Sequence, residues 1–313
     1  MTTTELDIRF ATKDDFDAIT KMSQNLFDGH DFLPALYHSW MDSDHMLVFV
    51  GTMDGNIVSL LVAHFIDGGR TVVHRGLRVD INQRGKGIST RMACHVDEYI
   101  RANYSSVERV RSTAGVDGED DASHIVQLKH GMAKIMEKSI VSYFLPEVIE
   151  HFCDVTATTL FTWKLSDIMR QIHDEHFLSL FEHNVHVSDW VPYEVTLPNI
   201  DEMFHHDDYC LVNVDPDNPD FEAPSSFSHA RVSVRVDYTH LEVTVYTKDA
   251  SLLKSHLMRH LRRAVAMELI NPIFVLFVHK EMVEMANQLL KGELQLEETT
   301  NYPHQMNLYE QKL

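Results

Sequence analysis

The sequence predicts a mixed α/β fold in which a mainly antiparallel sheet carries helices on both faces. Three apolar segments joined by glycine turns have the composition of strands, at Met46–Thr52, Ile57–Phe65 and Thr71–Val79. Segments with apolar residues at helical spacing stand before and after these strands. That order is typical of a sheet whose two faces are both covered by helices.

Two helices are expected before the strands. Thr12 caps the first, whose apolar residues recur at helical spacing: Phe16, Ile19, Met22 and Leu26. The second begins near Pro34 and ends before Asp42. The turns at Asp54–Gly55 and at 67–69 then join the three strands into a meander.

A glycine-rich loop follows the third strand, and a helix is predicted at Ile88–Asn103. A strand at Glu108–Ala114 comes next, and the acidic loop 117–121 leads into a helix that ends at Gly131. A hairpin is expected over Ala133–Leu145. These elements complete the first of two expected domains.

We place the two domains at residues 1–165 and 166–313, because 313 residues exceed one ordinary core. A helix at Ser166–Phe181 opens the second domain, and the loop 215–228, rich in Pro and Asp, interrupts it. Its later elements repeat the order strand, strand, helix, strand, helix of the first domain. They are Ala230–Tyr238, Leu241–Tyr246, Ala250–Leu269, Ile273–Val278 and Glu281–Leu290. We interpret this half as a second copy of the same fold.

The charge balance argues against polyanionic macromolecules as partners. Lys and Arg number 27 against 47 Asp and Glu, so the formal net charge is -20. Nucleic acids and anionic membranes both require a basic surface. We therefore expect neither as a partner, and the sequence shows no signal peptide and no apolar run long enough for a transmembrane helix.

The cysteines and histidines predict neither disulfides nor a metal site. The three cysteines stand far apart without a CxxC pair and are typical of reduced thiols in a cytoplasmic protein. The 21 histidines are scattered. Of the two close pairs, His205–His206 and His173 with His176, neither has a further Cys or His at ligand spacing, so a solvated surface is favoured over a metal site.

The segment from Leu77 to Arg91 carries the clearest functional signal. Gly85 and Gly87 follow a strand and precede a helix, an arrangement in which consecutive N–H groups can point into one concavity at a helix N-terminus and bind phosphate oxygens. Four basic residues and one acid give the segment a local charge of +3: Arg78, Arg84, Lys86 and Arg91 against Asp80. This inversion of charge within an acidic chain favours a pyrophosphate ligand.

The segment has three other possible interpretations. A Walker loop requires GxxxxGK[ST], whereas residues 84–90 are RGKGIST. A dinucleotide fingerprint requires a third glycine where Arg91 or its neighbours stand. A plain glycine turn capped by Ser89 or Thr90 is the structural alternative. The order of strand, RGxG and helix after an antiparallel meander favours the phosphate loop.

The run Val79-Asp-Ile-Asn-Gln-Arg-Gly-Lys-Gly-Ile resembles the acetyl-coenzyme A pyrophosphate loop of the GNAT superfamily, and the element order is similar to that fold. More narrowly, the chain resembles the vertebrate histidine N-acetyltransferase group. The matching motifs are Asp67-Gly-Gly-Arg-Thr71, Gly76-Leu-Arg-Val79, Arg84-Gly-Lys-Gly87, Asp189-Trp-x-Pro-Tyr193 and His260-Leu-Arg. The resemblance implies a GNAT fold followed by a degenerate GNAT-like domain, and transfer of acetyl from acetyl-CoA to a small amine such as the α-amine of histidine.

The resemblance also implies cofactor-binding positions. Backbone groups of Leu77 and Val79 would pair with the pantetheine arm, while Arg78 would face the cofactor, a substrate carboxylate or an acidic neighbour. The residues expected to hold the pyrophosphate are Arg84, Gly85, Lys86, Gly87, Ile88, Ser89 and Thr90. The second half has no such loop, because it passes from Tyr246 to Ala250 directly into a helix.

The catalytic positions depart from the common GNAT pattern. Many members carry a Glu as base on the strand before the loop, where this chain has His74 and Arg75. Many use a Tyr as acid on the following helix, where this chain has Gln127, which cannot donate a proton as an acid. His74 is a candidate base, acting directly or through a water, or else a buried hydrogen-bonded histidine. A thiol of pKa about 8.5 leaves readily enough for transfer without a strong acid.

Three residues are candidates for binding the substrate. Glu119 and His124 stand at the other wall of the expected cleft, where they would bind a cationic substrate or belong to a solvated acidic loop. Arg75 would pair with a substrate carboxylate, or would instead face the cofactor or an acidic neighbour. Because Gln127 and Arg75 occupy the two chemical positions, a non-catalytic acyl-CoA-binding sensor is the alternative function.

Overall fold

The structure, a computed structural model, describes residues 5–24, 26–118, 121–149, 159–214 and 224–313. The chain separates into two compact units, one of residues 1–135 with 307–313 and one of residues 136–306. This division falls at 135–136 and not at the expected boundary of 165–166, and it also assigns most of the last strand of the chain to the first unit. Glu119, an expected substrate-binding residue, lies outside the described residues.

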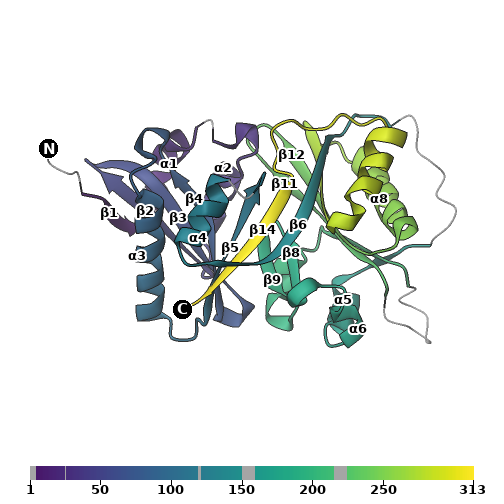
Figure 1. The fold of residues 1–313 in the computed structure, drawn as a ribbon, viewed down its shortest axis with the longest axis horizontal. Coiled ribbons are helices and arrows are strands. Elements are labelled where there is room, and N and C mark those ends of the chain that lie inside the picture. The colour runs from purple at the N-terminus through teal and green to yellow at the C-terminus, as the bar shows by residue number, and fades with distance from the viewer. Residues whose placement is uncertain (1–4, 25, 119–120, 150–158, 215–223) are drawn as a thin grey trace. The chain divides into compact units, whose positions relative to one another are not determined.

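The first unit is a mixed sheet with the strand order β1-β2-β3-β4-β5-β14 (Figure 1). Strands β1 to β4 pair antiparallel and β4 pairs parallel with β5, while the yellow C-terminal strand β14 lies beside β5. The strands are β1 Asp7–Phe10, β2 Met46–Met53, β3 Asn56–Ile66, β4 Thr71–Val79, β5 Arg109–Val116 and β14 Gln305–Lys312, and the α-helices are α1 Phe16–Met22, α2 Leu33–Met41, α3 Ile88–Asn103 and α4 Ala122–Lys129.

Helices cover both faces of this sheet because its central strands are apolar on both sides. Val48, Val50, Leu60 and Val62 pack against α1 and α2. The alternate residues of the same strands point to the opposite face, as the period of a strand requires, and pack against α3: Phe49, Leu61 and Ala63. The predicted bounds of β4 and α3 are confirmed.

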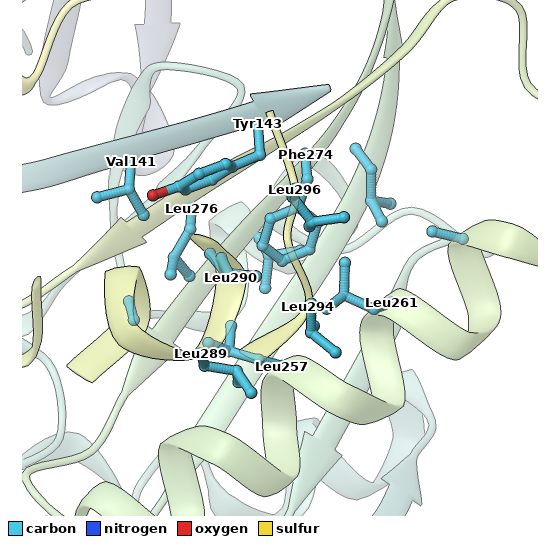
Figure 2. Packing of buried hydrophobic residues seen from close by; sticks show 14 of the residues in the cluster. Val141, Tyr143, Leu257, Leu261, Phe274, Leu276, Leu289, Leu290, Leu294 and Leu296 are labelled. Carbon is cyan, nitrogen blue, oxygen red and sulfur yellow. The ribbon is translucent and has the colours of Figure 1, made fainter. Parts of the chain in front are cut away.

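The second unit repeats this architecture with the strand order β6-β13-β12-β11-β10-β7 and a separate hairpin of β8 and β9. Its strands are β6 Ala133–Phe144, β7 Phe161–Trp163, β8 Val185–Ser188, β9 Val191–Glu194, β10 Tyr209–Val212, β11 Phe227–Val234, β12 Thr239–Tyr246 and β13 Pro272–Val278, and its α-helices are α5 Leu165–Gln171, α6 Glu175–Leu178, α7 Ile200–Met203, α8 Ala250–Val265 and α9 Val283–Asn287. Figure 2 shows Leu257 and Leu261 of α8 packed with Phe274 and Leu276 of β13 in its buried core.

Two expectations about elements were wrong, and strand β14 was not predicted. Residues 133–145 do not form a hairpin but one long strand, β6. The helix expected at 166–181 is broken, because the Asp174 side chain accepts the N–H groups of His176 and Phe177 at 2.9 Å each and so starts the new helix α6. Strand β14 lies in a segment for which no element was predicted.

Candidate active site

A β-bulge in β4 shapes the centre of the first unit. Arg75 pairs with Val62 and Arg78 with Leu60, so β4 carries one more residue than β3 between these pairs. Gly76 lies inside the bulge at φ 66°, a left-handed conformation that favours glycine. The extra residue places the side chains of Arg75 and Arg78 on the same face of the sheet, which regular alternation would not do.

Beyond the start of β4, the parallel strands β4 and β5 lose their common register. Their pairing begins at Thr71–Arg109 and its last described pair is His74–Ser112, although β4 continues to Val79 and β5 to Val116. Because the bulge bends β4 where this pairing ends, the segment 75–79 runs along an opening in the sheet. A strand edge at such an opening is suited to hydrogen-bond an extended ligand arm through its backbone.

The glycine loop lies at the far end of β4, directly before the 16-residue helix α3. Gly85 and Gly87 have φ 76° and 73°, and a Cβ added at either would meet no atom within 4 Å. Gly87 is the N-cap of α3 and has no side chain with which to bind the first N–H groups of the helix. The N-terminus of α3 thus has no side-chain cap, an arrangement that suits an anion, and the binding of a diphosphate there stays a prediction.

The charges around this loop are arranged differently from the expectation in one respect. Arg84, Lys86 and Arg91 are exposed. Arg78, in contrast, is 2 % exposed and pairs with Asp31, the acidic neighbour that was one of its three expected contacts. The Arg78 guanidinium also lies over the ring of Phe32, 5.0 Å from its centroid, so its side chain is committed to holding the segment before α2.

The other proposed cofactor residues divide into side-chain and backbone contributors. The Ile88 side chain is buried in the core beneath α3, and those of Leu77 and Val79 pack against the same core. These three residues can therefore offer a ligand only their backbone groups. Thr90 is exposed and Ser89 is partly exposed in the first turn of α3.

Arg75 is held by aromatic rings. Its guanidinium lies 5.4 Å from the ring centroid of Phe32 and 5.5 Å from that of Trp40, and the residue is partly exposed. Stacking of this kind fixes the plane of a guanidinium. Arg75 is thus a cation of defined orientation beside α2.

His74 points to the opposite face, toward α3. Its Nε2 lies 3.0 Å from Oδ1 of Asp97, and the two side chains are 8 % and 14 % exposed. The other carboxylate oxygen of Asp97 accepts the side-chain N–H of Gln311 at 2.9 Å. Burial lowers the pKa of the neighbouring His130, and the charge of His74 lowers it further. His74 is therefore partly buried and lies beside a carboxylate, and its role as a base stays a prediction.

A second cluster of polar side chains joins α4 to β5 and β14. The sequence analysis singled out Gln127 and His124 in this cluster, but not their partners. Gln127 donates to Ser112 Oγ at 3.0 Å, which fixes α4 beside the last pair of β4 and β5. One turn earlier on α4, His124 Nδ1 lies 2.6 Å from the hydroxyl of Tyr309 on β14. The alternation of Met306 and Leu308 with polar residues could have indicated a strand here, but not the helix it would meet.

The described residues contain no group of three or more His, Cys, Asp or Glu side chains arranged for a metal ion. None of their helices is both long and apolar enough to cross a membrane.

Comparison with known proteins agrees with this geometry. Residues 156–279 match the family model described as the C-terminal part of histidine N-acetyltransferase. A histidine N-acetyltransferase of Scomber australasicus is 25 % identical over 309 residues, which cover 94 % of this chain and 91 % of that protein. One of Xenopus tropicalis is 31 % identical over 109 residues, or 35 % of this chain and 34 % of that protein.

One solved structure is similar in fold over nearly the whole chain. A tandem GNAT protein from the clavulanic acid biosynthesis pathway superposes with a TM-score of 0.56 at 13 % identity, over 98 % of each chain. The fold is thus that of two GNAT-like domains. In sequence the chain is similar to histidine N-acetyltransferases, both over nearly its full length and in the C-terminal part that the family model describes.

Proposed function

We propose that this protein transfers the acetyl group of acetyl-CoA to the α-amine of histidine or a closely related amino acid in the cytoplasm. One observation carries the proposal: the sheet opens beyond His74–Ser112, and the same strand β4 leads to a helix N-terminus without a side-chain cap. An extended thioester bound along the opening, with its diphosphate at Gly85–Gly87, would bring its acyl end near the last strand pair. Relatives named for histidine acetylation match nearly the full chain, which supports the choice of amine.

The chain's own residues suit an amino-acid substrate. Arg75, oriented by two aromatic rings, binds the α-carboxylate. Arg75 and His74 lie on opposite faces of the sheet. A small substrate could contact both residues only through the opening between β4 and β5. The Arg84 and Lys86 side chains complement the diphosphate, and the acidic surface of the remaining chain disfavours larger polyanions.

The test is turnover. Purified protein is incubated with acetyl-CoA and a pool of the twenty amino acids, free thiol is measured, and acetylated products are identified by mass spectrometry. We expect thiol release that depends on the pool and acetylhistidine as the main product. Binding of acetyl-CoA without thiol release at high protein concentration would instead identify a non-catalytic sensor, for which the comparisons give no support.

A further inference from the structure

The contacts of β14 indicate how the proton moves during acetyl transfer, an inference that rests on the proposed function. The Tyr309 oxygen lies 2.6 Å from His124 Nδ1 and accepts an N–H of the Asn307 side chain at 3.1 Å. Tyr309 is fully buried, whereas His124 is partly exposed. The imidazole is therefore the member of the pair that a ligand can reach.

The hydrogen bond at Nδ1 determines what the other ring nitrogen can do. With Nδ1 held by a buried hydroxyl, the ring cannot turn freely, and Nε2 is directed away from Tyr309. A phenol hydroxyl both donates and accepts, so the contact persists whether the imidazole is neutral or protonated. Burial raises the pKa of Tyr309, which keeps the hydroxyl protonated beside the nearby charges of Asp121 and Lys134.

The position of His124 places Nε2 on the side where the sheet opens. Gln127 fixes α4 against Ser112, the last residue of β5 in register with β4. His124 lies three residues earlier, on the same face of α4 and one turn nearer to the end of β5. This is the direction in which β4 and β5 separate.

We propose that His124 carries the proton from the attacking amine to the departing sulfur, and that Tyr309 is its positioning residue. The substrate ammonium first loses one proton to solvent. The amine nitrogen then forms its bond to the thioester carbonyl carbon, and Nε2 of His124 accepts a proton from that nitrogen. When the C–S bond breaks, its electron pair goes to sulfur, and the imidazolium returns the same proton to sulfur. His124 ends the cycle neutral.

This assignment differs from the expectation that His74 is the base. His74 Nε2 already faces Asp97 within a buried pair, and that pair is tied to β14 through Gln311. The His74 Nε2 atom is itself buried, whereas His124 is partly exposed as a residue and its Nδ1 is fixed by Tyr309. His74 thus supports the sheet where it opens, and the last strand of the chain supports both histidines.

The experiment compares His124→Gln and Tyr309→Phe with the matched control His45→Gln, an exposed histidine of the same unit. Thiol release from acetyl-CoA with histidine is followed between pH 5.5 and 9, and acetyl-CoA affinity is measured by calorimetry to show that each variant is folded. We expect H124Q to lower kcat about 100-fold, the lower end for a lost general base, with acetyl-CoA affinity unchanged. The fall of kcat at acidic pH should vanish in H124Q, move in Y309F and persist in H45Q.

A further variant, His124→Ala, should regain part of its activity with added imidazole, which a purely structural role does not predict. Wild-type turnover with normal kcat in H124Q would overturn this inference and leave the proposed function intact. Absence of turnover in the wild type across all amino acids would overturn both.

Discussion

In the first unit the parallel strands β4 and β5 stay in register for four residue pairs, whereas the equivalent strands β12 and β13 of the second unit stay in register for six. The antiparallel partner of β4 shows a register shift, while β11 and β12 pair over eight residues without one. The bulge and the opening therefore occur together in one unit and are both missing from the described strands of the other.

The helices that follow these strands differ in what caps their N-termini. The N-cap of α3 is Gly87, which offers no side chain, whereas the N-cap of α8 is Asp249, whose carboxylate accepts the N–H groups of Ser251 and Leu252. The Asp249 carboxylate is thus an internal anion at the N-terminus of α8, in the place that a phosphate would take at the N-terminus of α3. The second unit shows that the fold forms without an opening and without an uncapped helix N-terminus, so the fold itself does not require these features of the first unit.

The largest expected effect comes from placing an internal anion in the first unit as well. Gly87→Asp should weaken acetyl-CoA binding by about 100-fold, because a carboxylate at the N-terminus of α3 competes with and repels the diphosphate. Calorimetric titration measures this affinity.

The chain offers a matched control for this variant. Gly55 in the turn between β2 and β3 has φ 76° and equally open space, so Gly55→Asp imposes the same strain and charge away from the loop. Its acetyl-CoA affinity should equal that of the wild type. Equal losses in both variants would show that strain or net charge, and not the loop, governs binding.

The phosphate loop could be predicted from sequence because its signal is local. Gly85, Gly87 and the apolar spacing of α3 lie within twenty residues, and backbone conformation follows directly from such residues. The pairing of Asp31 with Arg78 could not be predicted in this way, since the two residues are 47 positions apart in the chain. The same limit hid Tyr309, which meets His124 across 185 positions through a strand that returns to the first unit.

The second unit is further distinguished by histidines in its core. The two ring nitrogens of His256 form hydrogen bonds with the hydroxyls of Ser226 and Ser228, at 2.9 and 2.7 Å. The Ser228 hydroxyl also lies 2.7 Å from Nε2 of His260. Burial lowers the pKa of His256 to about 3 and that of His260 well below its usual value. Both rings are therefore neutral in the folded protein at pH values where an unfolded chain would bind protons.

Stability of this unit should consequently fall as the pH drops below about 6.5, the pKa of histidine in an unfolded chain. Each such histidine lowers the free energy of unfolding by about 1.4 kcal/mol per pH unit until its folded-state pKa is reached. His256→Gln should reduce that slope by this amount between pH 6 and 4, as measured by urea unfolding. His206→Gln, at an exposed position, should leave the slope unchanged, and an unchanged slope in H256Q would contradict the assignment of a neutral buried ring.

The smallest expected effect tests whether an empty helix N-terminus is sufficient for binding. Asp249→Ala removes the internal anion of α8 and should lower the free energy of unfolding by about 1 kcal/mol, the usual value of a lost N-cap. Asp249→Ser, which keeps a capping oxygen, should recover most of it. The number of acetyl-CoA molecules bound per chain in calorimetric titration should stay at one in both variants, because β12 and β13 remain paired and offer no opening for the pantetheine arm. A second bound molecule in the Ala variant would show that the cap alone separates the two units in function, and that the opening of the sheet contributes little to cofactor binding.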